Sequence, residues 1–156
     1  MKVLLVEDDV EKSEILQGFL GREFPAFDVV TATSFDGGLR ALTSSQPIDL
    51  MLLDMSMPSH EPSAADPQGG PEGYAGKELL AHMALRRIRT PTIVVTMFDA
   101  FGKGENRTSL DELKADLRTR FSPVFRGLVY YNVAQEGWRA ELRTLIEGTL
   151  RESSSR

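Results

Sequence analysis

The feature that most constrains the fold of this chain is a regular alternation of strand-like and helix-like segments. Short runs of apolar and β-branched residues recur five times, at 2–6, 28–33, 48–53, 92–96 and 127–131. Each is followed by a segment whose apolar residues repeat at helical spacing, near 11–20, 34–42, 76–84, 110–121 and 138–149. Strands that alternate with helices pair in parallel through crossover connections. The sequence therefore predicts an α/β fold, a doubly wound sandwich with a parallel five-stranded sheet.

Composition narrows the class of protein. The chain has 156 residues, of which 41% are hydrophobic, so it is long enough for one domain with an ordinary core. Its net charge of -5, with no basic cluster, argues against a nucleic-acid binder. The absence of cysteine, with only two histidines, argues against disulfides and zinc sites. No run of transmembrane length and no signal peptide are recognisable, so we expect a cytoplasmic protein that does not bind membranes.

Two segments interrupt the alternation. Residues 59–73 carry three prolines and three glycines with almost nothing apolar, which predicts a long flexible loop beside the end of the third strand. A second loop at 98–106 precedes a helix that opens with a capping box, Ser109 and Glu112. We expect one domain over 1–152 and a disordered tail over 153–156.

Acidic and hydroxyl residues follow the strands at corresponding positions. Glu7 and Asp8 follow the first strand, Asp54 follows the third, and Thr96 ends the fourth. Taken singly, each is a common turn or strand residue, but the carboxyl ends of parallel strands meet at one edge. Carboxylates that converge repel one another unless a cation joins them, and oxygen ligands without sulfur or nitrogen suit Mg²⁺. This pattern indicates a Mg²⁺ site that assists phosphoryl transfer to a carboxylate, with the Thr96 hydroxyl as a donor to a phosphoryl oxygen.

Three stretches resemble the receiver domain of two-component response regulators: VLLVEDD at 3–9, DLMLLDMSMP at 49–58 and TIVVT at 92–96. The resemblance covers 2–96 and, more loosely, the last strand and helix, and it implies a flavodoxin-like (βα)5 sandwich. It also implies that Asp54 is the phosphoacceptor, that Asp8 binds Mg²⁺ directly, and that Glu7 does so largely through water. The backbone carbonyl of Ser56 would be the third protein ligand. Thr96 would contact the phosphoryl group and swing inward after phosphorylation.

The chain departs from this family pattern in two inserted segments and in its last strand. The pattern has no counterpart of the loop at 59–73, and the stretch between residue 96 and the last strand is too long by about one helical element, so we expect insertions near 59–73 and 98–121. Receivers carry a lysine at the end of that strand, whose ammonium group pairs with the phosphoryl group, but here the position falls on Tyr131 or Asn132. Neither provides positive charge, and the larger Met97 follows Thr96 where a small residue is usual. Lys103 and Lys114 are candidate replacements. Without a cation we expect slow phosphorylation of Asp54 and a weak conformational response, both strengthened by restoring a lysine.

Two functions fit these features. The first is a stand-alone receiver that accepts a phosphoryl group from a sensor histidine kinase or a phosphotransfer protein. The alternative is an atypical pseudo-receiver, a protein-interaction module without a phosphorylation cycle. A Mg²⁺-dependent phosphatase fits less well, because no general acid or second nucleophile is evident. We expect no enzyme activity beyond slow self-phosphorylation and self-dephosphorylation, and no output domain on this chain.

The resemblance also implies a surface for partners. Receivers often pair through the face made by the fourth helix, the fifth strand and the fifth helix. In this chain that face would include an extra helix near 110–121 and the pair Tyr130 and Tyr131. We expect a homodimer or a protein partner there.

Overall fold

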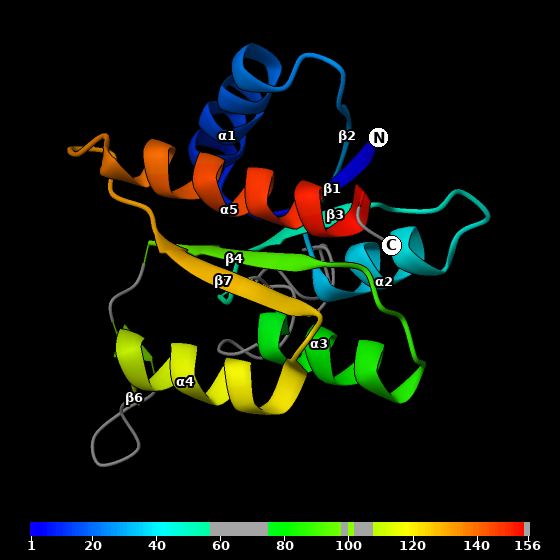
Figure 1. Ribbon diagram of the computed structural model, residues 1–156. Helices are drawn as coiled ribbons and strands as arrows, with labels where there is room; N and C mark the ends of the chain where they lie inside the picture. Colours follow the sequence, from blue (N-terminus) through cyan, green and yellow to red (C-terminus); the bar gives the residue numbers. More distant parts are fainter. Residues whose placement is uncertain (57–74, 98–99, 102–107, 155–156) are drawn as a thin grey trace, which may run out of the picture.

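A parallel five-stranded sheet runs through the centre of the protein, in the order β2-β1-β3-β4-β7 (Figure 1). The computed structural model describes residues 1–56, 75–97, 100–101 and 108–154. The five strands of the sheet are β1 (Lys2–Val6), β2 (Asp28–Ala32), β3 (Leu50–Leu53), β4 (Thr92–Thr96) and β7 (Phe125–Tyr130). All neighbouring strands pair in parallel, which confirms the predicted fold class.

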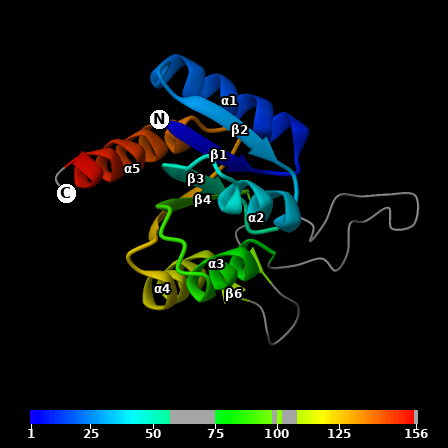
Figure 2. The ribbon, with the colours of Figure 1, turned by 90° about the vertical axis from the view of Figure 1, so that its right-hand side faces the viewer.

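Helices cover both faces of the sheet (Figures 1 and 2). One face carries α1 (Val10–Glu23) and α5 (Gly137–Ser154), and the other carries α2 (Phe35–Thr43), α3 (Ala75–Leu85) and α4 (Leu110–Phe121). Two apolar cores result, one on each side of the sheet. All four residues of β3 are fully buried, because this central strand contacts both cores. A continuous apolar run is what such a position requires.

Polar side chains fix where three of the helices begin. Asp9 caps α1 by accepting a hydrogen bond from the backbone amide of Lys12, and Ser34 caps α2 in the same way through Gly37. Ser109 and Glu112 form the predicted capping interaction at the start of α4. The first turn of α1 is therefore anchored directly beside the end of β1, where the acidic residues lie.

The connection between β4 and β7 differs from the prediction. It contains a small antiparallel pair, β5 (Ala100–Phe101) with β6 (Thr108–Ser109), and then α4. The helix over Leu110–Phe121 packs as the fourth helix of the alternation, so the expectation of an extra helix was wrong in the described part of the chain. The described part of the added length is the β5–β6 pair.

The C-terminal boundary also differs, because α5 continues through Ser154 and includes the first half of the expected tail. The predicted loop over 59–73 lies outside the described residues. Among the residues that are described, no helix is both long and apolar enough to cross a membrane.

Candidate functional site

The register of the sheet places the acidic residues side by side. Val6 pairs with Leu53, so the residues that follow them leave the sheet next to each other, and the Asp54 amide donates to the Val6 carbonyl at 3.0 Å. The chain builds the sheet outward in opposite directions from β1 and β3. In such folds the crevice outside the carboxyl ends of these two strands is the usual ligand site. Glu7, Asp8 and Asp54 occupy that position.

The three carboxylates form a compact cluster. One oxygen from each of Glu7, Asp8 and Asp54 lies within 4.8 Å of the others. Glu7 and Asp54 are buried, whereas Asp8 is exposed. Burial, followed by the negative charge of Asp54, raises the pKa of Glu7 to about 8, against an opposing effect of Lys12. The same two causes raise the pKa of Asp8. Converging hard oxygen donors of this kind, with one open to solvent, fit a divalent cation such as Mg²⁺.

A lysine that sequence reasoning overlooked completes the cluster. Lys12, in the first turn of α1, is only 1% exposed. Its ammonium group forms an ion pair with Glu7, lies 3.2 Å from Asp54 Oδ1, and donates to the Val95 carbonyl at 2.7 Å. The site therefore contains a cation, although the expected lysine in the last strand is absent.

A signal for Lys12 was present in the sequence. Lys12 lies four residues before Leu16, which lies four before Leu20, so all three share one side of α1. The two leucines are the apolar stripe that packs on the sheet. A lysine at the head of a buried stripe, close to an acidic strand end, indicates a buried ion pair.

Tyr131 and Asn132 are the two residues on which the position of the usual lysine falls. Tyr131 directly follows β7, is 3% exposed, and its amide donates to the Thr96 carbonyl at 2.7 Å. Its ring centre lies 5.8 Å from the Lys12 ammonium nitrogen and 5.0 Å from the ring centre of Trp138. Burial raises the pKa of Tyr131, so its hydroxyl is neutral. Asn132 instead accepts a hydrogen bond from the Ala134 amide in the following turn.

The other predicted site residues are distributed around the same edge. Thr96 ends β4 and is fully buried, and Met97 after it is 38% exposed. Ser56 lies two residues beyond Asp54, and the ligand function of its carbonyl stays a prediction. Lys114 lies on α4, and none of the ion pairs seen in the described ranges joins it to the acids. Lys103 is outside those ranges.

The start of α3 packs closely against the backbone of Asp54 and Met55. The Gly76 amide donates to the Met55 carbonyl at 3.2 Å. A Cβ atom at Gly76 would lie 2.4 Å from the Asp54 carbonyl oxygen and 2.8 Å from the Met55 Cα, closer than real contacts allow. Glycine therefore lets the helix approach the backbone of Asp54 and Met55 closely.

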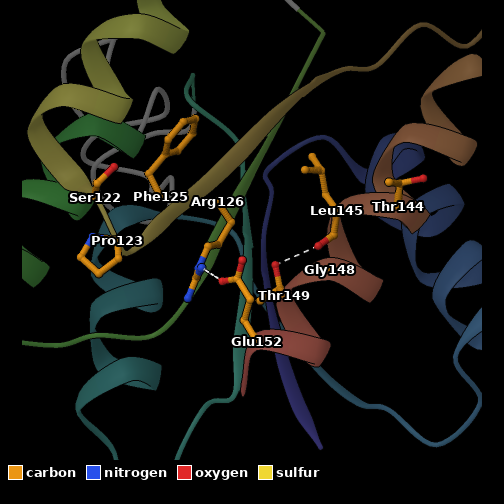
Figure 3. Close-up of a pocket in the computed structure, with 9 residues that line it drawn as sticks. All are labelled: Ser122, Pro123, Phe125, Arg126, Thr144, Leu145, Gly148, Thr149 and Glu152. Carbon is orange, nitrogen blue, oxygen red and sulfur yellow. Dashed lines mark hydrogen bonds and ion pairs between the residues drawn. The ribbon is translucent and has the colours of Figure 1, made fainter. Parts of the chain in front are cut away.

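A cavity of about 350 Å³ lies elsewhere on the molecule (Figure 3). It is formed by the start of β7 and the later turns of α5, where Arg126 and Glu152 point toward one another and form an ion pair. Because β7 is parallel to the other strands, its amino end lies at the opposite end of the sheet from the acids. This cavity therefore takes no part in the acidic site.

The strand order, together with acids at the ends of β1 and β3, defines a receiver domain. No protein-family model matches the chain. The Detocs response regulatory protein DtcB of Enterobacter cloacae (strain JD6301) is 33% identical over 145 residues, covering 91% of this chain and 95% of that protein. The chain therefore belongs to the response regulator receiver family.

Solved structures agree with this fold. A response regulator receiver domain protein from Clostridium thermocellum matches with a TM-score of 0.65 and 19% identity, covering 98% of this chain and 96% of that one. The Mn²⁺-bound form of response regulator Rcp1 matches with a TM-score of 0.62 and 17% identity, covering 92% and 90%. At these identities the structures support the fold alone.

Proposed function

We propose that this protein is a phosphoacceptor receiver, in which Asp54 accepts a phosphoryl group in a Mg²⁺-dependent reaction. The observation that carries the proposal is the convergence of two further carboxylates and one ammonium group on Asp54, at the strand ends where the sheet reverses direction. Glu7, Asp8 and Asp54 would hold the ion. The Mn²⁺-bound form of Rcp1, a response regulator of the same fold, supports a divalent cation in such a protein.

The transfer itself needs little from the protein beyond positioning and charge. A carboxylate oxygen of Asp54 attacks the phosphorus atom of a phosphohistidine or a small acyl phosphate. The new P–O bond makes an acyl phosphate, the bond from phosphorus to the donor breaks, and the leaving group keeps the electron pair. Bound Mg²⁺ would supply positive charge for the phosphoryl oxygens. The Thr96 hydroxyl, at the neighbouring strand end, would donate a hydrogen bond to one of them.

The proposal assigns the chain to signalling rather than to conventional enzyme catalysis. The donor would be a sensor histidine kinase or a phosphotransfer protein, and the chain itself would at most slowly phosphorylate and dephosphorylate itself. The alternative of a pseudo-receiver drew its support from the missing lysine in the last strand. The ammonium group of Lys12 at 3.2 Å from Asp54 weakens that argument.

The proposal is tested by intact-mass measurement. Wild-type protein is incubated with excess small acyl phosphate and Mg²⁺, and Asp54→Asn, which keeps the shape but removes the nucleophile, is the control. We expect one phosphoryl group on the wild type and none on the variant. Absence of any mass gain on the wild type, with this donor and with candidate kinases, would refute phosphorylation and leave the pseudo-receiver.

The face of α4, β7 and α5 stays the predicted surface for a homodimer or a protein partner. Tyr130, at the end of the edge strand β7, is 36% exposed. A tyrosine that becomes buried in an interface often contributes strongly to the binding free energy. We expect Tyr130→Ala to weaken self-association or partner binding at least about tenfold, measured by sedimentation velocity with and without phosphodonor. Wild type that stays monomeric at high concentration would rule out the homodimer.

A further inference from the structure

We propose that Lys12 is the phosphoryl-pairing cation of this receiver, moved from the end of the last strand to the first turn of α1. This inference rests on the proposed function, since it names the group that compensates the charge on phosphorylated Asp54. Three observations carry it: the burial of Lys12, the geometry of its ammonium group, and the position of Tyr131 beside that group.

The first observation is that Lys12 occupies an unfavourable position for a positive charge. Lysine is almost never fully buried unless it is paired, and Lys12 is 1% exposed. It is also the third residue of α1, where the helix dipole disfavours cations. Its ion pairs with Glu7 and Asp54 offset both costs. Among the described contacts of Lys12, these two carboxylates are the only groups of opposite charge, so the acidic site holds the side chain inward.

The second observation is that the ammonium group joins the strands that build the site. An ammonium group has three donors. Lys12 donates to Asp54 Oδ1 after β3 and to the Val95 carbonyl within β4, and its ammonium group forms an ion pair with Glu7 after β1. A phosphoryl group on Asp54 adds about two negative charges at this point. The ammonium group already contacts the carboxylate that would carry them, so pairing needs no large movement of α1.

The third observation is that Tyr131 and Lys12 complement each other. Tyr131 is one of the two residues on which the position of the usual lysine falls, and its ring centre lies 5.8 Å from the Lys12 ammonium nitrogen. The ring fills the space beside the site, while α1 supplies the charge. The sequence predicts slow transfer because it indicates no cation at the site. Lys12 provides one, so that reason no longer holds.

The relocation changes which structural elements would be coupled to a phosphoryl group on Asp54. A lysine at the end of β7 would couple the phosphoryl group to that strand. Lys12 instead couples it to α1 and, through the Val95 carbonyl, to β4 next to Thr96. Trp138, the single tryptophan, packs against both Phe19 of α1 and Tyr131, with ring centres 5.5 and 5.0 Å away. Its fluorescence therefore reports on this junction.

The test compares phosphorylation rates and Trp138 fluorescence in matched variants. Lys12→Met removes the charge, and Lys12→Gln removes it but keeps a donor for the Val95 carbonyl. We expect both to slow phosphoryl incorporation from a small acyl phosphate roughly tenfold or more, since hydrogen bonds to charged groups contribute at least that factor. The phosphodonor-dependent fluorescence change should also be lost. Lys114→Met removes the same charge from α4 and should match the wild type in both measurements.

The double variant Lys12→Met/Tyr131→Lys moves the cation to the end of β7. We expect it to recover most of the rate, which a purely structural function of Lys12 would not allow. Thermal melts establish which variants fold. If Lys12→Met does not fold, Lys12→Gln or the double variant tests the proposal in its place.

Folded Lys12→Gln with the wild-type rate and fluorescence response would overturn the proposal, as would a folded double variant that recovers nothing. A wild type that takes up no phosphoryl group would overturn the proposed function and this inference with it. If the wild type is phosphorylated and the folded Lys12 variants match its rate and fluorescence response, the inference alone would be overturned.

Discussion

Asp8→Ala is expected to remove most of the Mg²⁺ affinity of the protein. Asp8 is the exposed member of the three carboxylates that lie within 4.8 Å of one another, so in the proposed metal site it would be the first ligand to meet an incoming hydrated ion. Losing an outer-shell partner of a metal ligand already costs about 10–100-fold in affinity, and a direct ligand should cost at least as much. Phosphorylation of Asp54 should slow in parallel. Calorimetric titration with Mg²⁺ measures the first effect.

The control for this variant is Asp9→Asn. It removes one negative charge from the adjacent residue but keeps an oxygen that can cap α1. We expect its Mg²⁺ affinity to change much less than that of Asp8→Ala. Equal affinities in the wild type and Asp8→Ala would show that the acidic cluster is not the metal site.

Gly76→Ala is expected to destabilise the fold by roughly 1–3 kcal/mol, the usual cost of overpacking. The new Cβ would lie 2.4 Å from the Asp54 carbonyl oxygen and 2.8 Å from the Met55 Cα. Both are backbone atoms, so relief requires α3 to move away from the strand end. The backbone of Asp54 and Met55 would shift with it, and the proposed phosphorylation of Asp54 should slow as well. Denaturant unfolding measures the free energy of unfolding.

The same substitution at Gly21 provides a control of opposite sign. Gly21 lies within α1, and a Cβ there would meet no atom within 4 Å. Gly21→Ala should therefore stabilise the protein by about 0.5–1 kcal/mol, because alanine favours the helix. If Gly76→Ala were as stable as the wild type, the close approach of α3 to Asp54 would be wrong.

Much of the fold could be predicted because burial on a sheet leaves a strong pattern. The apolar run that became β3 is buried on both faces, and alternation with helices determined the parallel topology. Element boundaries were less certain. The first helix was expected near 11–20, but α1 continues to Glu23, with Gly21 inside it. The helix over Leu110–Phe121 was counted as extra because the β5–β6 pair is too short to leave a periodic signal.

The acids of the site were predictable, but its cation was not found. Glu7, Asp8 and Asp54 follow strands directly, so parallel pairing alone brings them together. Lys12 reaches the site from the first turn of a helix, and the search for a cation was confined to the long segment before the last strand, which contains Lys103 and Lys114. The structure instead places the ammonium group of Lys12 beside Asp54.

The most direct test of the phosphoacceptor assignment is a time course of phosphoryl incorporation with and without Mg²⁺, followed by peptide mapping. The acidic site at the strand ends predicts that the phosphoryl group appears only when Mg²⁺ is present and is carried by the peptide that contains Asp54. A phosphoryl group on another peptide, or incorporation at Asp54 that is equally fast after removal of all divalent cations, would contradict it.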